Sequence, residues 1–309
     1  MPLVSIILNI RNGAAFLREA IDSLLAQSFT NWELVAWDDC STDGSANIVG
    51  GYQDPRIRYF LSPRETSLGE ARNLAIQQAS AEWLAFIDQD DVWLPEKLQQ
   101  QMALAGNGVG IIYGRAVMFD SRRGNLWDYD YAHEFQPLPE GNIFPQLFRD
   151  ACFIAMSTAV LRRSAVAEAG EIPEGIQMVP DYYLYVAVAR RWKARAVQGV
   201  VCRYRVHPGS MSASRENRMR LQSEPLAIVG QWAGELDPRI AAYRRMTYST
   251  ALAFEEMREL RTAGMGLKRL FTDGSLLWLI SRPFVRLWRR ARRKLGRPCW
   301  QSSGPQAVD

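Results

Sequence analysis

The first 113 residues alternate short apolar runs with segments of helical periodicity. Residues 3–10 are almost all β-branched or aliphatic, which is typical of a strand buried on both faces of a parallel sheet. Residues 14–27 place Leu17, Ile21 and Leu24 on one side of a helix. The alternation continues with strands predicted at 33–37, 57–61, 83–87 and 109–113 and helices at 67–79 and 95–104. Repeated β-α-β units predict an α/β fold, with a mostly parallel sheet and helices on both faces.

The rest of the chain is less regular. Beyond about Gly114 lies an aromatic, loop-rich stretch in which residues 127–131 could line an acceptor pocket or form a surface loop on the sheet. The pattern then predicts a helix at 180–192, a strand at 195–205 and helices within 215–264. Residues 276–295 carry apolar side chains at helical spacing with arginines between them, which predicts an amphipathic segment interrupted at Pro283.

The charge of the chain is unevenly distributed. Its 37 Lys and Arg against 33 Asp and Glu give a net charge of +4, but residues 282–297 hold eight basic residues and no acidic one. The rest has 29 basic against 33 acidic residues, so nucleic-acid binding by the body of the fold is not expected. We expect the segment 276–297 to contact an anionic membrane, with packing on the domain as the alternative.

Cysteine usage and hydropathy favour a cytoplasmic protein. The four cysteines are scattered, form no CxxC pair, and belong to a chain too long to need disulfide staples. The N-terminus lacks a positively charged leader, and the apolar stretch at 276–280 is far shorter than the ~20 residues of a membrane-spanning helix. We therefore expect a cytoplasmic protein, with peripheral association at the inner face of the plasma membrane through the tail.

Polar side chains follow three of the predicted strands at the point where each strand ends. The three groups are Asn9 to Asn12, Asp38 with Asp39, and Asp88 to Asp91. Ligands bind outside the carboxyl ends of strands in an open parallel sheet, so these groups should converge. Two carboxylates separated by one residue repel each other unless a cation lies between them, and Mg²⁺ or Mn²⁺ fits that arrangement. Each aspartate alone could be a turn former, but turn chemistry gives no reason for three groups to meet.

Other phosphate-binding motifs are absent from the sequence. No GxxxxGK[ST] occurs and no GxGxxG follows a strand, so neither a P-loop NTPase nor a dinucleotide oxidoreductase is supported. An aspartyl phosphatase also places Asp-x-Asp after a buried strand and stays an alternative. Against it, Val92 stands where that enzyme class would carry a hydroxyl residue.

A series of short motifs runs along the first 215 residues. They are Val4 to Ile7, Ala26 to Phe29, Asp38 to Ser45, Ala71 to Asn73, Phe86 to Asp91, Ser157 to Arg163, Asp181 to Leu184 and Tyr204 to Ser210. In order and spacing this series resembles the family 2 glycosyltransferases, the inverting, nucleotide-sugar-dependent enzymes of the GT-A fold. The resemblance implies a catalytic domain at 1–215, with a nucleotide-sugar-binding half at 1–113 and an acceptor-binding half at 114–215. Residues 216–309 would form a C-terminal helical region with the basic tail.

The resemblance also implies a set of nucleotide-binding residues. Asp39 would accept a hydrogen bond from the nucleobase, Arg72 would lie against the base or the phosphates, and Asp88 would contact the ribose or the metal. The family usually has a Pro-x-Tyr-Asn turn after the first strand, where this chain begins its turn with Asn9. Arg11 could replace the aromatic residue, because a guanidinium plane can also stack on a base.

The metal and catalytic residues follow from the same resemblance. Asp90, together with Asp88, would bind a divalent cation, Mn²⁺ or Mg²⁺. Asp181 matches the catalytic base, but Pro180 stands where the family has Glu, and Asp181 could instead be a helix N-cap. His207 would lie beside the diphosphate or ligate the metal, with a backbone-bonded loop residue as its alternative.

The expected reaction is the transfer of one sugar from a nucleotide-diphospho-sugar to a hydroxyl of a glycan or lipid-linked glycan, as in cell-surface polysaccharide, lipopolysaccharide or capsule synthesis. A metal and a basic side chain would stabilise charge on the departing diphosphate, while a carboxylate opposite removes the acceptor proton. Ala189 to Trp192 replaces the Gln-x-x-Arg-Trp of processive synthases, so polymer synthesis is not expected. A catalytically silent glycan- or nucleotide-binding module is the alternative from another class.

Overall fold

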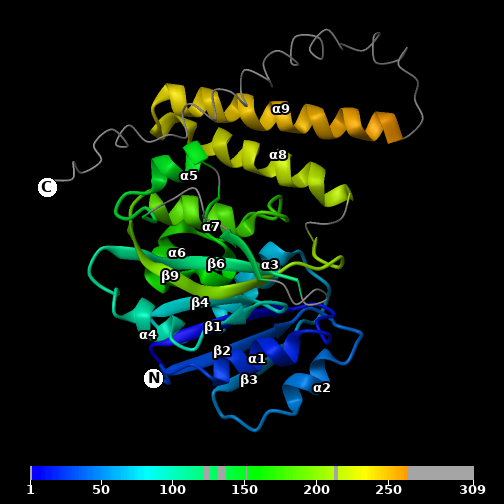
Figure 1. Ribbon diagram of the computed structural model, residues 1–309, viewed down its shortest axis with the longest axis vertical. Helices are drawn as coiled ribbons and strands as arrows, with labels where there is room; N and C mark the ends of the chain where they lie inside the picture. The colour runs from blue at the N-terminus through cyan, green and yellow to red at the C-terminus, as the bar shows by residue number, and fades with distance from the viewer. Residues whose placement is uncertain (1, 121–125, 131–136, 151, 212–214, 263–309) are drawn as a thin grey trace, which may run out of the picture. The chain divides into compact units, whose positions relative to one another are not determined.

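The computed structural model describes residues 2–120, 126–130, 137–150, 152–211 and 215–262 (Figure 1). Its strands are β1 (Val4–Ile10), β2 (Trp32–Asp38), β3 (Ile57–Leu61), β4 (Trp83–Asp88), β5 (Val92–Trp93), β6 (Val109–Phe119), β7 (Leu126–Asp130), β8 (Val160–Arg162) and β9 (Lys193–Arg205). Its α-helices are α1 (Leu17–Leu25), α2 (Ser45–Gly50), α3 (Leu68–Gln77), α4 (Lys97–Met102), α5 (Phe144–Asp150), α6 (Arg163–Ala169), α7 (Pro180–Ala189), α8 (Arg215–Trp232) and α9 (Pro238–Thr262). The described residues also include the 3₁₀ helices η1 (Met156–Thr158) and η3 (Ala233–Glu235).

The described strands form one sheet, in the order β3-β2-β1-β4-β8-β6-β9-β5, with β7 paired to β6. β1 pairs in parallel with β2 and β4, and β2 pairs in parallel with β3. β8 lies antiparallel between β4 and β6, and β9 is parallel to β6 but antiparallel to β5. The sheet is therefore parallel where the β-α-β pattern predicts it and mixed beyond, which confirms the α/β class.

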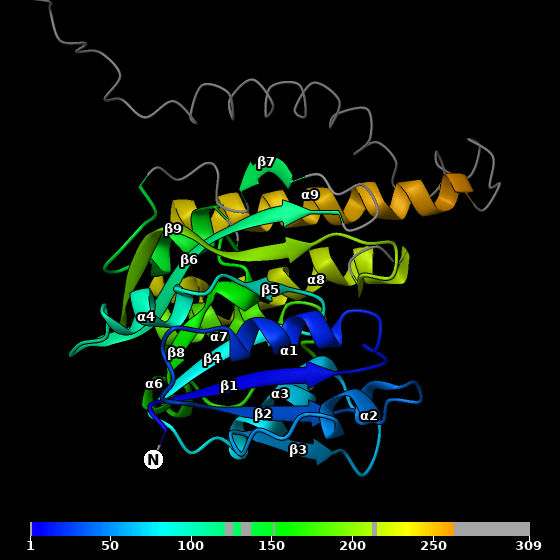
Figure 2. The same ribbon diagram turned by 60° about the horizontal axis from the view of Figure 1, so that its bottom comes forward.

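Neighbouring residues of β1 are buried in two different cores. Ile7 packs in a core that includes residues of α3, α5, α6 and α7. Ile6 and Leu8 pack on the opposite face, with residues of α1, α2 and α4. Side chains alternate across a strand, so an unbroken apolar run is buried only if both faces are covered. Figure 2 shows β1, β2 and β3 side by side, with α1 next to β1.

Most predicted elements are present, with some ends displaced. β3 has the predicted bounds, α7 begins at the predicted residue, and the strand predicted at 109–113 continues to Phe119. β5, β7, β8, α5 and α6 were not predicted, because each is short and most lie where the periodicity is weakest. Residues 126–130 of the aromatic stretch form β7.

The residues that carry the site belong to a compact unit that spans 1–253, which extends past the predicted domain end at residue 215. The basic tail at 276–297 lies outside the described residues, so its predicted membrane contact stays a prediction. Within the described part of the chain, no helix is both long enough and apolar enough to cross a bilayer.

Candidate active site

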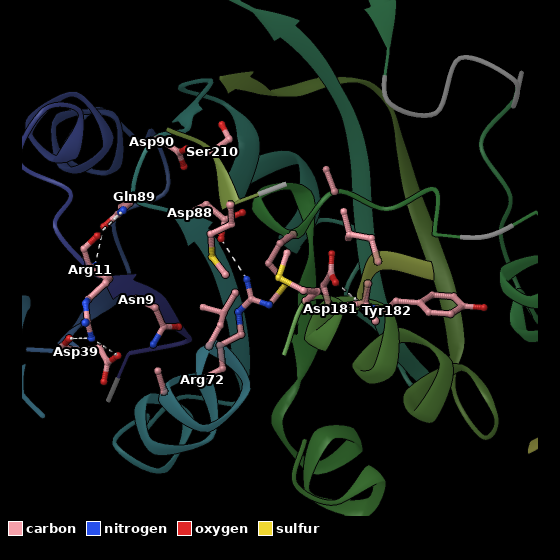
Figure 3. Close-up of a pocket in the computed structure, with 18 of the residues that line it drawn as sticks. Asn9, Arg11, Asp39, Arg72, Asp88, Gln89, Asp90, Asp181, Tyr182 and Ser210 are labelled. Atoms are coloured by element: carbon pink, nitrogen blue, oxygen red, sulfur yellow. Dashed lines mark hydrogen bonds and ion pairs between the residues drawn. The ribbon is translucent and has the colours of Figure 1, made fainter. Parts of the chain in front are cut away.

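The predicted site residues meet at the carboxyl ends of three neighbouring strands. Asn9 of β1 is in register with Asp88 of β4, and Ile10 with Asp38 of β2. A pocket of about 930 Å³ opens beside these strand ends. All the predicted residues line it, namely Asn9, Arg11, Asp39, Arg72, Asp88, Asp90, Asp181 and His207. Figure 3 shows Asp39 and Asp181 on opposite sides, with Arg72 and Asp88 between them.

Asp39 and Arg11 form one end of the pocket. The backbone N–H and hydroxyl of Thr66 donate to Asp39 Oδ1, at 3.0 and 2.8 Å. Arg11 Nη1 lies 3.2 Å from Asp39 Oδ2, and Arg11 Nη2 lies 2.7 Å from Glu65 Oε1. Arg11 and Asp39 are thus held by residues that follow β3, a strand end that the sequence analysis did not use. Asp38, in contrast, is buried and bonded to Tyr59, so it is a structural residue.

The loops after β1 and β2 are bonded to each other. Asn12 and Cys40 have left-handed backbone conformations, with φ of 50° and 58°. Asn12 Oδ1 accepts the N–H of Thr42 at 2.8 Å, and the N–H of Asn12 donates to Ser41 Oγ at 2.9 Å. Asparagine tolerates this conformation better than most residues, and strained backbone persists where surrounding bonds fix it. The loops therefore hold Arg11 and Asp39 in a defined geometry.

Arg72 and Asp88 occupy the middle of the pocket (Figure 3). Arg72 Nη2 lies 3.2 Å from Asp88 Oδ1; the Arg72 side chain is 5% exposed and that of Asp88 is 37% exposed. Burial against the protein raises the pKa of Asp88 to about 6, with Asp90 and Asp181 adding to the rise and Arg72 opposing it. The charges of two neighbouring carboxylates thus oppose ionisation of Asp88, and a cation bound beside it would relieve that repulsion.

Asp90 meets His207 on the wall next to Asp88. His207 Nε2 lies 2.8 Å from Asp90 Oδ2, so the imidazole contacts a carboxylate of the acidic loop. The ring also packs against Phe16, with 4.7 Å between centroids. The Arg205 Nε–H donates to the backbone oxygen of Asp90 at 2.6 Å, which helps to hold the loop in place.

Asp91 holds the acidic loop in place from within the core. It is buried, and its carboxylate accepts the Ser157 hydroxyl at 2.5 Å and the Arg205 N–H at 2.9 Å. Ser157 Oγ also accepts the N–H of Asp88 at 2.9 Å. Burial raises the pKa of Asp91 well above its ordinary value. Asp91 and Ser157 belong to the sequence motifs, but only the contacts between distant segments show that these two residues position the acidic loop.

Asp181 lies in the first turn of α7. Val179 is the N-cap residue and Pro180 the first helical residue, so the alternative that Asp181 is the N-cap is wrong. The carboxylate of Asp181 accepts the N–H of Tyr182 at 2.8 Å. Burial raises the pKa of Asp181, and the charge of Arg72 opposes that rise.

The wall beyond Asp181 was missed by the sequence analysis. It contains apolar and aromatic side chains from α8, α9 and two loops, namely Met178, Met211, Leu221, Pro225 and Tyr248. These residues carry no motif and are far apart in the chain. Only the packing of α8 and of the first part of α9 within the unit 1–253 brings them to the pocket.

The carboxylates can supply part of a metal site. Among the described residues, no group of three or more His, Cys, Asp and Glu side chains is arranged so that it could hold a metal ion without further ligands. Asp88, Asp90 and His207 nevertheless offer oxygen and nitrogen donors on one wall of the pocket. Mg²⁺ and Mn²⁺ are commonly held by one or two carboxylates, with substrate phosphates and water completing the shell. The donor set fits such an ion.

Comparison with known proteins places the chain in a family. The model of glycosyl transferase family 2 matches residues 5–170. UDP-Glc:alpha-D-GlcNAc-diphosphoundecaprenol beta-1,3-glucosyltransferase WfaP of Escherichia coli is 30% identical over 232 residues, which cover 74% of this chain and 88% of WfaP. The enzyme of the same description named WfgD, also from Escherichia coli, is 28% identical over 229 residues, which cover 72% of this chain and 85% of WfgD.

Solved structures share the fold. S. aureus TarS 1-349 in complex with UDP-GlcNAc has a TM-score of 0.60 at 18% identity, covering 87% of this chain and 77% of that one. Mannosyltransferase PcManGT from Pyrobaculum calidifontis, in complex with GDP-Man and Mn²⁺, has a TM-score of 0.59 at 19% identity, covering 93% and 83%. The predicted GT-A fold is thereby confirmed. With a family match over more than half of its length, this chain belongs to glycosyl transferase family 2, the inverting glycosyltransferases of the GT-A fold.

Proposed function

We propose that the protein transfers one sugar, with inversion, from a nucleotide-diphospho-sugar to a hydroxyl of a lipid-linked glycan in cell-surface polysaccharide synthesis. The observation that carries the proposal is one pocket with Asp39 at one end, Arg72 and Asp88 in the middle and Asp181 opposite. The names of WfgD and WfaP state UDP-glucose as donor and diphosphoundecaprenol-linked GlcNAc as acceptor, so these substrates are the first to test.

The nucleotide would occupy the end of the pocket formed by Asp39 and Arg11. Asp39 would accept an N–H of the base, and Arg11 would lie along the base plane. Arg72 would then face the diphosphate, where its buried guanidinium stabilises the negative charge that grows as the glycosidic bond to the phosphate breaks. Its ion pair with Asp88 keeps the guanidinium directed into the pocket.

Asp181 would act as the general base. A carboxylate with a raised pKa is a better proton acceptor than an ordinary one, provided that it is ionised at the working pH. It would take the proton of the acceptor hydroxyl as that oxygen attacks the anomeric carbon from the side away from the diphosphate. Attack from behind the leaving group inverts the configuration.

We also propose that the enzyme is metal-dependent. Asp88, Asp90 and His207 would hold Mn²⁺ or Mg²⁺ beside the diphosphate. When bound, the ion supplies positive charge that stabilises the departing nucleoside diphosphate. PcManGT, which shares the fold, was solved in complex with GDP-Man and Mn²⁺, and this supports the assignment.

A panel of nucleotide sugars tests the function. UDP-glucose, UDP-N-acetylglucosamine and GDP-mannose are incubated with Mn²⁺ and with GlcNAc-diphosphoundecaprenol, and both nucleoside diphosphate release and the extended acceptor are measured. We expect one donor to give both products. Nucleotide binding without turnover of any donor would instead indicate the silent module. No nucleotide affinity together with a phosphorylated Asp88 would indicate the phosphatase.

We further propose a cytoplasmic location at the inner face of the plasma membrane, with the basic segment 276–297 as the contact. The lipid-linked acceptors named for WfgD and WfaP support this location. Binding of the full chain and of a variant without residues 275–309 to anionic liposomes tests it. Unchanged binding after the deletion would leave packing on the domain as the role of the segment.

A further inference from the structure

A buried glutamate of α8 binds the segment that leads into α7. Glu224 is 6% exposed, and its Oε2 accepts three consecutive backbone N–H groups. The donors are Gln177 at 3.1 Å, Met178 at 2.7 Å and Val179 at 3.1 Å. Among the described residues its Oε1 has no hydrogen-bond partner, so the hydrogen bonds that the structure gives this carboxylate all go to that segment. Hydrogen bonds to an ionised acceptor are about twice as strong as neutral ones.

These three donors precede the candidate base, with only Pro180 between Val179 and Asp181. Val179 is the N-cap of α7, and its side chain is no hydrogen-bond acceptor, so Val179 cannot satisfy the N–H groups at this helix end. Glu224, from another helix, instead accepts the N–H of Val179 itself and of the two residues before it, and a carboxylate suits this end of a helix. Asp181 follows Val179 by two residues, so the direction of its carboxylate depends on how 177–179 are held.

We propose that Glu224 is a positioning residue that holds 177–179 so that Asp181 faces the reacting hydroxyl. The inference rests on the proposed function, in which Asp181 is the base. It also gives α8, which lies outside the residues matched by the family model, a part in the chemistry. A reacting group displaced by about 1 Å can lose about 100-fold in rate, so a hydrogen-bonded clamp at this point matters for turnover.

The chain offers a matched control at the other end of α7. Arg190, the C-cap of α7, forms an ion pair with Glu235 of η3, with Nη2–Oε1 and Nε–Oε2 distances of 2.5 and 2.9 Å. Both glutamates join the segment of α8 and η3 to α7, but only Glu224 contacts the residues before Asp181. If the two glutamates only tether α8 and η3 to α7, replacing either of them should lower the rate. If Glu224 positions the base, only the replacement of Glu224 should lower it.

The experiment compares Glu224→Ala, Glu224→Gln and Glu235→Ala with the native protein, using UDP-glucose and GlcNAc-diphosphoundecaprenol, or the donor that the panel selects. Rates are normalised to the folded fraction. For Glu224→Ala we expect kcat to fall about 10- to 100-fold with the donor KM within about 2-fold. Glu224→Gln keeps a carbonyl acceptor and should recover kcat to within about 5-fold of native. Glu235→Ala should have native kcat.

Native kcat in folded Glu224→Ala, or an equal loss in Glu235→Ala, would overturn the inference. If Glu224→Ala does not fold, Glu224→Asp replaces it, because Asp keeps the carboxylate but its shorter side chain moves that group away from the three N–H groups. A native kcat in folded Glu224→Asp would likewise overturn the inference. Asp181→Asn keeps the two proposals apart, since native kcat in that variant refutes Asp181 as the base and leaves the Glu224 contacts untouched.

Amide hydrogen exchange tests the contacts without any turnover. The amides of residues 177–179 should exchange at least about 10-fold faster in Glu224→Ala than in the native protein and in Glu235→Ala. Unchanged exchange would show that Glu224 does not hold the segment. If the native protein transfers no sugar, that result counts against the proposed function and against the positioning role. The exchange measurement would still decide whether Glu224 holds residues 177–179.

Discussion

His207 Nε2 lies 2.8 Å from Asp90 Oδ2, although the two residues are 117 positions apart in the chain. The contact joins the residues after β9 to the acidic loop after β4, and it sets a nitrogen and an oxygen donor side by side on the pocket wall. Imidazole and carboxylate donors together suit Mn²⁺. The pair therefore provides a direct test of metal dependence.

Replacing Asp90 with Ala should abolish metal-stimulated turnover. We expect a loss of about 100-fold or more in nucleoside diphosphate release, because the leaving group then lacks its charge stabilisation. The measurement is the rate with the active donor against Mn²⁺ concentration, alongside circular dichroism for the fold. Asp90→Asn, which keeps the size of the side chain, separates the loss of charge from the loss of packing. A native rate in Asp90→Ala would refute the metal assignment.

Replacing Asp181 with Asn should remove sugar transfer and leave nucleotide binding intact. General bases contribute about 10²- to 10⁴-fold, so we expect a fall in kcat within that range. Because the pKa of Asp181 is raised, the native rate should decline on the acid side at a higher pH than an ordinary aspartate would give. The rate should rise with pH through that pKa, since the ionised form is the active one. A pH–rate profile and nucleotide titration check both statements.

Replacing Arg11 with Ala should weaken donor binding without changing the chemical step. A guanidinium stacked at an exposed site is worth about 0.5–1 kcal/mol, so the donor KM should rise about 2- to 5-fold at native kcat. Glu65→Gln is the control, because it removes the ion pair of Arg11 but leaves the guanidinium in place. An equal rise in KM in both variants would assign the effect to the ion pair instead of the base contact.

The buried Lys97 leads to a prediction about the free energy of unfolding, which does not depend on the candidate active site. Its side chain is buried, with Nζ 2.6 Å from Gln101 Oε1 and 3.9 Å from the centre of the Trp93 ring. Burial lowers the pKa of Lys97 to about 7, so the unfolded chain binds the proton more tightly between pH 7 and about 10.5. The free energy of unfolding should therefore rise with pH over that window, by an amount on the order of 1–2 kcal/mol between pH 7 and 9.

Lys97→Met should lose this pH dependence and gain stability at pH 7, because Met fills a similar volume without a charge. Urea unfolding at pH 7 and pH 9 measures both effects. Lys193→Met, at an exposed position, is the matched control and should keep the native pH dependence. An identical pH dependence in native and Lys97→Met protein would contradict the prediction.

The local sequence pattern was sufficient to predict the N-terminal half of the sheet and the residues at the ends of its strands. The alternation of Ile6, Ile7 and Leu8 between two cores follows from strand geometry, because neighbouring side chains point to opposite faces. Parallel strands end at one edge, so Asn9, Asp39 and Asp88 had to come together. Motif order alone was enough to include Asp181 and His207 among the residues that line the pocket.

Packing between distant segments decided what the sequence could not show. β8 is only three residues long and β5 only two, so their periodicity carries no signal. Glu224 has no motif, and its bonds to 177–179 exist only because α8 packs beside α7. Ser157 and Asp91 meet across 66 residues for the same reason. Periodicity and motif order describe neighbours along the chain, whereas the wall beyond Asp181 and the contacts that orient the site depend on which helices bury their apolar faces together.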